Sequence, residues 1–328
     1  NIKNIYIVAI CGTGMASLAG LLKEAGYQVS GSDNNIYPPM STLLANCGIP
    51  IKQGFKRENI TADIDLAVIG NAVSKTNEEV QAILDAGIPF VSFPQALSRF
   101  FLENRKSLVV AGTHGKTTTS SLLSWVLHAA GRQPGFMVGG WLKNFDTNYQ
   151  LPRGDFFVTE GDEYDTAFFD KGPKFLHYKP YAAILTSIEF DHADIYRDLD
   201  HIKEAFAKFT AIIDPAGFLL VEHTDMHIKD VTSHARCEVE TYGFSSSADW
   251  SIDAYRFHEG KGSFVLRHRG REAGQFELPM MGRHNALNAV AVTALAIKLG
   301  LSAEEVRSAL HGFRGVKRRQ DIVGEQNG

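Results

Sequence analysis

"VVAGTHGKTTTS", from Val109 to Ser120, is the stretch that decides the fold of this chain. Apolar residues lead into small ones, and a lysine and three threonines then open a helix-like pattern. This order predicts a strand, a tight turn and a helix, the arrangement of a phosphate-binding loop. The spacing is unusual, because the pattern G-x-x-x-x-G-K-[ST] requires a glycine where the chain has Val110. The nearest glycine is Gly112, three residues before Gly115.

The unusual spacing does not remove the physical basis of phosphate binding. Small residues let backbone N–H groups face an anion, and the dipole of the following helix points at it. We expect Lys116 to reach the β- and γ-phosphates and the hydroxyl of Thr117 to bind Mg²⁺. The expected ATP-binding residues of the loop are Gly112, Thr113, His114, Gly115, Lys116, Thr117 and Thr118. The alternative is a glycine turn that carries an exposed lysine.

Acidic residues follow two further predicted strands. "DFFVTEGDEYD" ends in Glu160, with Asp162, Glu163 and Asp165 beyond it. "ILTSIEFDHADIY" places Glu189, Asp191, His192 and Asp194 at a second strand end. Metal–phosphate sites form at the carboxyl ends of parallel strands, and Mg²⁺ takes oxygen ligands. These stretches therefore predict a metal site, with an acidic surface loop and a structural histidine as the alternatives.

A later segment, "GRHNALNAV", begins a predicted helix. His284 and Asn288 are four residues apart and share one helix face, with Asn285 nearby. Asparagine at a helix start is often only a cap, and that alternative stays open.

A second glycine loop lies near the start of the chain. "CGTGMAS" supplies Gly12 and Gly14, but Ser17 replaces the third small residue of a dinucleotide fingerprint, and Asp33 follows at the distance of a ribose contact. The loop fits NAD, or any nucleotide diphosphate held at a helix N-terminus. Two nucleotide loops in one chain indicate an ATP-driven reaction on a substrate that carries its own nucleotide.

The order of elements predicts an α/β fold. Strands at 4–10, 27–33, 65–70 and 88–93, with helices between them, form a Rossmann-like parallel-sheet domain at 1–104. A P-loop ATPase-like domain follows at 105–312, with an antiparallel β excursion at 250–280. Ser302 and Glu305 predict a capping box at the last helix. Residues 313–328 are predicted to form a linker toward a C-terminal domain.

The composition of the chain argues against some classes of partner and indicates a cellular compartment. The chain has 328 residues and a formal net charge of -4, which argues against nucleic acid or a membrane as partner. It has three scattered cysteines and no apolar run of about 18 residues. We therefore expect a cytoplasmic protein.

Several blocks of this sequence resemble those of the Mur ligases, which build and recycle the peptide of peptidoglycan. The resemblance rests on "GTHGKTTT", "GDEYD", "SIEFDHADIY", "GRHNALNA" and "GVKRRQDIVGE", in the expected order. "DEYDTAFFDKGPKFLHY" is similar to the branch that attaches the tripeptide L-Ala-γ-D-Glu-meso-diaminopimelate to UDP-N-acetylmuramate. The alternative branch attaches L-alanine.

The resemblance implies roles for individual residues. Those implied for the UDP-sugar are Gly12, Thr13, Gly14, Met15, Asp33, Asn71 and Ala72. Thr117, Glu160 and His192 would bind Mg²⁺, whereas His284, Asn285, Asn288 and Arg319 would join the loop around ATP. Lys116, His192, Glu160 and His114 are the expected catalytic residues. His114 would contact the substrate carboxylate or simply pack in the loop. Lys203 and Lys208 are the nearest lysines to the position of a carbamylated lysine, and neither receives that role.

The implied reaction is ATP-dependent amide formation through an acyl phosphate. The family has a third, Rossmann-like domain that positions the amine, and we expect it to be absent from this chain. The chain alone should then bind UDP-N-acetylmuramate, bind ATP weakly and form no amide. An NAD-dependent dehydrogenase and a non-catalytic nucleotide switch remain as remote alternatives.

Overall fold

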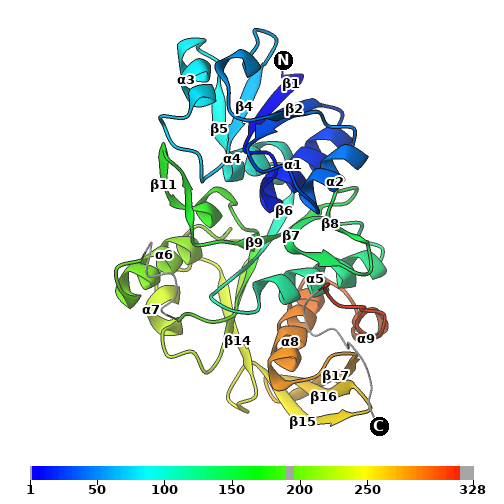
Figure 1. Ribbon diagram of the computed structural model, residues 1–328. Coiled ribbons are helices and arrows are strands. Elements are labelled where there is room, and N and C mark those ends of the chain that lie inside the picture. Colours follow the sequence, from blue (N-terminus) through cyan, green and yellow to red (C-terminus); the bar gives the residue numbers. More distant parts are fainter. Residues whose placement is uncertain (1, 190–195, 318–328) are drawn as a thin grey trace, which may run out of the picture.

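The fold is known from a computed structural model that describes residues 2–189 and 196–317. An N-terminal domain stands above a larger central domain, and the chain passes from the first to the second after residue 102 (Figure 1). The α/β architecture expected from the sequence is confirmed, with a parallel sheet in the first domain and a mixed sheet in the second.

The N-terminal domain is a parallel sheet of five strands in the order β3-β2-β1-β4-β5. Its elements are β1 (Asn4–Val8), α1 (Thr13–Glu24), β2 (Gln28–Asp33), α2 (Met40–Asn46), β3 (Ile51–Gln53), the 3-10 turn η1 (Arg57–Asn59), β4 (Leu66–Ile69), α3 (Glu78–Asp85), β5 (Phe90–Ser92), α4 (Phe93–Leu97) and the π-turn η2 (Ser98–Leu102). Successive residues of β1 face opposite sides of the sheet, so that Ile5 and Ile7 join one apolar cluster and Tyr6 and Val8 another.

The central domain has a sheet of ten strands in the order β17-β16-β15-β14-β13-β12-β6-β9-β7-β8. Its first elements are β6 (Lys106–Ala111), α5 (Lys116–Ala129), β7 (Gly135–Leu142), β8 (Thr147–Gln150), β9 (Phe156–Gly161), β10 (Asp165–Ala167), β11 (Asp170–Pro173), the 3-10 turn η3 (Lys174–His177) and β12 (Ala182–Leu185). The remaining elements are α6 (Leu199–Ala211), β13 (Phe218–Glu222), α7 (Ile228–Thr232), β14 (Glu238–Gly243), β15 (Trp250–His258), β16 (Lys261–His268), β17 (Arg271–Leu278), α8 (Arg283–Lys298) and α9 (Ala303–His311).

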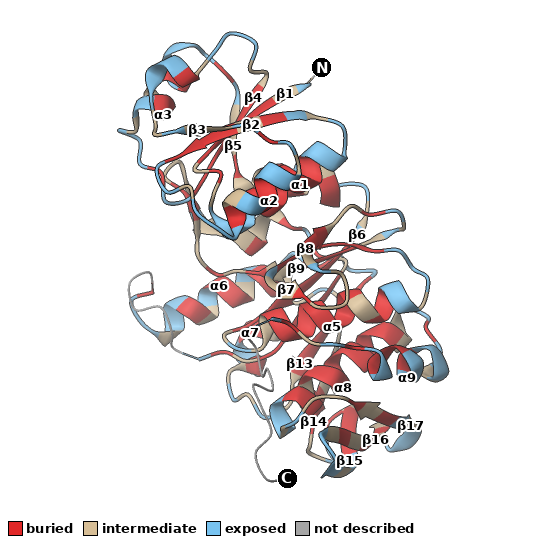
Figure 2. Ribbon diagram, turned by 45° about the vertical axis from the view of Figure 1, so that its right-hand side comes forward, coloured by how far each residue is buried: buried red, intermediate tan, exposed pale blue. Residues whose placement is uncertain are grey.

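Helices cover both faces of this central sheet. Helices α5 and α8 pack together on one face and are largely buried (Figure 2). Alternate residues of β6 explain the two layers, because Leu108 and Val110 join the cluster under α5 and α8, whereas Val109 and Ala111 join the cluster that includes the apolar residues of α6. The predicted antiparallel excursion is confirmed as β15–β17, and the capping box of Ser302 and Glu305 is confirmed at α9.

One apolar cluster belongs to both domains. It runs from Ile5 and Leu18 of the first domain to Tyr149 and Phe157 of the second. Polar contacts follow the same boundary, since Asn148 donates from Nδ2 to Ser17 Oγ at 2.8 Å and the Tyr149 hydroxyl lies 3.3 Å from Cys47 Sγ. The domains are therefore packed against each other over a common core.

A small hairpin, β10–β11, makes a second contact between the domains. The hairpin reaches toward the N-terminal domain (Figure 1). Its tip carries Phe168 and Phe169, which pack against the apolar cluster that contains Tyr6 and Val8 of β1. The rings of Phe169 and Phe90 meet edge to face, with centroids 5.0 Å apart.

Candidate functional site

The loop between β6 and α5 has the geometry of a phosphate cradle. Gly112 and Gly115 have φ angles of 124° and 81°, which favour glycine. A Cβ at Gly112 would overlap the hydroxyl of Thr186, and a Cβ at Gly115 would lie 3.1 Å from Asn288 Oδ1. Backbone conformation and close packing thus both call for glycine here, and the helix α5 begins directly after the loop at Lys116.

Lys116 lies folded back over this loop. Its Nζ donates to the carbonyl oxygen of Gly112 at 2.7 Å and lies 3.1 Å from Glu163 Oε2. The pair is enclosed, with side-chain exposures of 13% for Lys116 and 4% for Glu163. The lysine is thus held at the loop by an acid from the segment between β9 and β10.

Glu160, at the end of β9, connects the loop to the neighbouring strand. The hydroxyl of Thr117 donates to Glu160 Oε2 at 3.1 Å, and the N–H of Gly139 donates to Oε1 at 2.6 Å. Burial raises the pKa of Glu160 above its ordinary value, and the nearby charge of Asp162 adds to the rise. A cation at this carboxylate would offset the cost of its ionisation.

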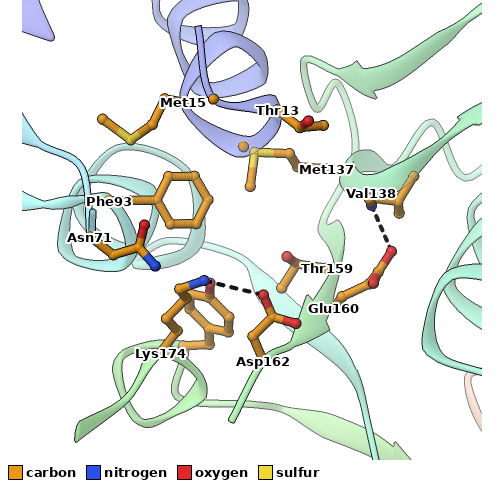
Figure 3. Close-up of a pocket in the computed structure, with 14 residues that line it drawn as sticks. Thr13, Met15, Asn71, Phe93, Met137, Val138, Thr159, Glu160, Asp162 and Lys174 are labelled. Atoms are coloured by element: carbon orange, nitrogen blue, oxygen red, sulfur yellow. Dashed lines mark hydrogen bonds and ion pairs between the residues drawn. The ribbon is translucent and has the colours of Figure 1, made fainter. Parts of the chain in front are cut away.

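The other face of Glu160 opens into a cavity of about 340 Å³ between the domains (Figure 3). Its walls come from the starts of α1 and α4, the loop after β4, the strands β7 and β9, and the turn η3. The lining residues are Gly12, Thr13, Gly14, Met15, Asn71, Phe93, Met137, Val138, Gly139, Thr159, Glu160, Asp162, Lys174 and Tyr178. The glycine loop and the end of β9, far apart in the sequence, therefore face one space.

The predicted substrate residues mostly lie at this cavity. Gly12, Thr13, Gly14 and Met15 line it, and so does Asn71. Ala72 is the exposed next residue and is not part of the lining.

Asp33 is not part of the lining either. Its carboxylate accepts the backbone N–H groups of Cys11 and Asn35, both at 2.9 Å. This carboxylate therefore holds the glycine loop against the end of β2.

The predicted residues of α8 lie beside the phosphate loop. Asn288 Oδ1 lies close to Gly115, 3.1 Å from where a Cβ on that glycine would stand, and Asn288 Nδ2 lies 3.5 Å from Asn285 Oδ1. Asn285 also donates to the carbonyl of Met281 at 2.8 Å, as a helix-start residue does. His284 packs over Gly282. The asparagines thus combine a local structural role with a position at the loop.

His114 and Thr113 are not among the lining residues of the cavity. His114 Nε2 lies 3.5 Å from Glu189 Oε2, and both side chains are largely exposed. The hydroxyl of Thr113 accepts the N–H of Glu189 at 2.9 Å. Thr118 is buried in the first turn of α5.

Two predicted residues, His192 and Arg319, lie outside the described residues. Within 2–189 and 196–317, no three His, Cys, Asp or Glu side chains gather closely enough to hold a metal ion by themselves. Thr117 and Glu160 nevertheless bring a hydroxyl and a carboxylate together beside the loop, and these are the hard oxygen donors that Mg²⁺ takes.

Several cavity residues were not predicted from the sequence. Lys174 and Tyr178 lie in "DKGPKFLHY", which carries a family resemblance but no binding or catalytic pattern of its own. Met137 and Val138 lie in β7, which was not predicted, although the apolar run "GFMVGGWL" bounded by loop residues is a strand signal. The sequence analysis therefore missed a strand, β7, that forms part of the cavity wall.

None of the described helices qualifies as a membrane-spanning segment.

Comparison with known families matches both domains. The Mur ligase family, catalytic domain, matches residues 4–105, and the Mur ligase middle domain matches residues 110–296.

Two curated relatives match over 99% of this chain. The UDP-N-acetylmuramate–L-alanyl-γ-D-glutamyl-meso-2,6-diaminoheptandioate ligase of Escherichia coli strain K12 is 40% identical over 324 residues, and the match covers 70% of that protein. The UDP-N-acetylmuramate–L-alanine ligase of Carboxydothermus hydrogenoformans is 36% identical over 324 residues, with 68% of that protein covered.

A solved structure has the same fold over the whole match. The crystal structure of UDP-N-acetylmuramate:L-alanyl-γ-D-glutamyl-meso-diaminopimelate ligase from Neisseria meningitides superposes with a TM-score of 0.90 at 41% identity. The match covers 97% of this chain and 100% of that one.

Proposed function

The chain belongs to the Mur ligase family, and we propose on this basis that it serves the ATP-dependent joining of L-Ala-γ-D-Glu-meso-diaminopimelate to UDP-N-acetylmuramate, a step of peptidoglycan recycling in the cytoplasm. One observation supports this function above the others. Glu160 accepts a hydrogen bond from the hydroxyl of Thr117 in the phosphate loop, and it also lines the inter-domain cavity. A phosphoryl donor and a second nucleotide substrate can therefore meet at one carboxylate.

The phosphate loop would bind ATP. Lys116 would leave Glu163 and contact the β- and γ-phosphates, while the N–H groups of the loop and the start of α5 face the triphosphate. Thr117 and Glu160, with His192, would hold Mg²⁺, which when bound neutralises charge on the transferring phosphoryl group. Asn288, next to Gly115, places the start of α8 where the rest of the nucleotide would lie.

The cavity would bind UDP-N-acetylmuramate. The amides of Gly12, Thr13 and Gly14 at the start of α1 suit its diphosphate, since the N-terminus of a helix favours an anion. Met15 and Asn71 line the same cavity. NAD remains the alternative ligand for this loop, but a dehydrogenase would give no role to the phosphate loop that shares Glu160 with the cavity.

The proposed reaction has two steps. An oxygen of the lactyl carboxylate attacks the γ-phosphorus of ATP, so that an acyl phosphate forms and ADP leaves. The amino group of the tripeptide then attacks the acyl carbon, the amide bond forms, phosphate leaves, and the amine loses its proton. Lys116 stabilises the charge that develops during the first step, because a fixed cation near the phosphoryl oxygens lowers its barrier.

The acceptor tests this function. The full-length gene product, supplied with ATP, Mg²⁺ and UDP-N-acetylmuramate, should use the tripeptide with a far higher kcat/KM than L-alanine, with products identified by mass spectrometry. A preference for L-alanine would instead assign the protein to the alanine-adding branch. The same assay with NAD and no ATP should give no turnover.

A further inference from the structure

The charge of the cavity is poorly matched to an anionic substrate. Glu160 and Asp162 line it, and Lys174 is the one cation among its described lining residues. The substrate proposed above carries a diphosphate and a carboxylate. The backbone amides of the glycine loop before α1 can bind the diphosphate. Lys174 is then the described lining residue that can offer a full positive charge to the carboxylate.

Lys174 is held firmly at the wall of the cavity. Its backbone N–H donates to the carbonyl of Tyr164 at 3.1 Å, and the N–H of Phe175 donates to the carbonyl of Asp162 at 3.3 Å. Its Nζ lies 3.3 Å from Asp162 Oδ2, and only 16% of its side chain is exposed. The ammonium has three N–H donors, so it can keep Asp162 and still donate to a ligand.

The hairpin β10–β11 supports this position from outside. Lys174 follows the last residue of β11, and the tip of the same hairpin packs against Phe90 of the N-terminal domain. The hairpin is thus supported by the domain that carries the glycine loop. Lys174 therefore has a defined place relative to both walls of the cavity.

The neighbours of Lys174 identify which anion it meets. Lys174 comes from the central domain and pairs with Asp162, and Glu160, which contacts Thr117 of the phosphate loop, lies farther along the same side of the cavity (Figure 3). Thr13 and Met15, at the start of α1, lie on the opposite side (Figure 3). A sugar nucleotide that places its diphosphate at α1 would extend its carboxylate toward Lys174 and Glu160.

We propose that Lys174 binds the lactyl carboxylate of the sugar nucleotide and presents it to the phosphate loop, an inference that rests on the function proposed above. The ammonium holds one carboxylate oxygen and leaves the other to attack phosphorus. Asp162 orients Lys174 and lies beside the carboxylate site.

Two sugar nucleotides test this role without any need for turnover. UDP-N-acetylglucosamine has the same diphosphate and amino sugar as UDP-N-acetylmuramate but lacks the lactyl carboxylate. In calorimetric titrations of this chain, Lys174→Met should weaken UDP-N-acetylmuramate by about 10- to 100-fold, the range expected for a hydrogen bond to a charged group. Its affinity for UDP-N-acetylglucosamine should stay within about twofold of wild type.

Two further variants serve as controls. Lys171→Met removes an exposed lysine of the same hairpin, which pairs with Asp165 at 3.6 Å, and should change neither affinity. Lys174→Arg keeps the charge and should restore most of the affinity for UDP-N-acetylmuramate. The melting temperatures of all three variants show whether the fold is kept.

The outcomes separate this inference from the function on which it rests. Wild-type chain that binds no UDP-N-acetylmuramate would overturn the proposed function, and the role of Lys174 with it. Wild-type binding with an unchanged affinity in Lys174→Met would overturn the role of Lys174 alone. Equal losses for both sugar nucleotides would also reject it, because the lysine would then act on the diphosphate or on the fold.

Discussion

Lys116 of the phosphate loop and Glu163 form an enclosed ion pair, with Nζ 3.1 Å from the nearer carboxylate oxygen. The loop therefore holds its lysine against a carboxylate. Binding of a triphosphate would require Lys116 to exchange that carboxylate for phosphate oxygens.

Lys116→Ala should strongly lower ATP-dependent turnover while UDP-N-acetylmuramate binds as before. Lys116 belongs to the central domain, and the proposed diphosphate site lies at α1. Removal of one electrostatic stabiliser of this kind lowers kcat by about 100- to 1,000-fold. Steady-state rates of the full-length gene product and calorimetric titration of the sugar nucleotide measure the two effects. Turnover within about tenfold of wild type would exclude this loop as the phosphoryl site.

Glu163→Gln should lower the melting temperature without ligand and increase the rise that Mg-ATP produces. The substitution leaves the Lys116 ammonium in an enclosed place without its carboxylate, and the loss of one partner of a buried pair costs up to about 3–5 kcal/mol. The hydrogen bond from Lys116 to Gly112 should keep the loss below that limit. Triphosphate oxygens then supply the missing charge. Thermal shifts at a series of ATP concentrations give the result, and an ATP-induced rise no larger than that of wild type would contradict it.

Glu160 should make the ligand-free protein less stable as pH rises. Burial raises its pKa in the folded state above its value in the unfolded chain. The folded state therefore holds the proton more tightly, and stability is lost as pH rises from the unfolded pKa through the raised folded pKa. Glu160→Gln should be more stable than wild type at pH 8 and should lose that advantage in acid. Urea unfolding across this pH range measures the difference, which should not depend on pH if Glu160 is not the group responsible.

Gly20→Ala should destabilise the chain although it places alanine within a helix. In an open helix this change would add roughly 0.5–1 kcal/mol of stability. Here the new methyl group would overlap the ring of Tyr149, which comes from β8 of the other domain. The effect should be smaller when Gly20→Ala is introduced into a Tyr149→Ala background, and a double-mutant cycle of unfolding free energies measures it. Equal effects in both backgrounds would show that this contact does not limit the packing.

Local pattern explains why the phosphate loop and its neighbours could be predicted. The loop, Lys116, Thr117 and the end of β9 are each defined by a few adjacent residues, and parallel strands bring their carboxyl ends to one edge of a sheet. The pairing of β6 with β9 places Val110 opposite Glu160, so the acid reaches the loop as expected. The roles of these residues in ATP and metal binding remain predictions.

Long-range packing explains what could not be predicted. Lys174 reaches the cavity only because β10 and β11 pair and because the hairpin packs against the N-terminal domain. Met137 is near Glu160 because β7 lies beside β9, a contact that no local pattern around Met137 reveals. Strands β13 and β14 were also not predicted, although "FLLVE" is a short apolar run.

The apolar cluster shared by the two domains has a thermodynamic consequence. Neither domain can unfold without exposing side chains that the other buries, so heating should give one calorimetric transition whose van't Hoff and calorimetric enthalpies agree. A ligand of either domain would then raise the same transition temperature. A substitution that weakens one domain would, in turn, reduce the fraction of molecules in which the distant site is formed.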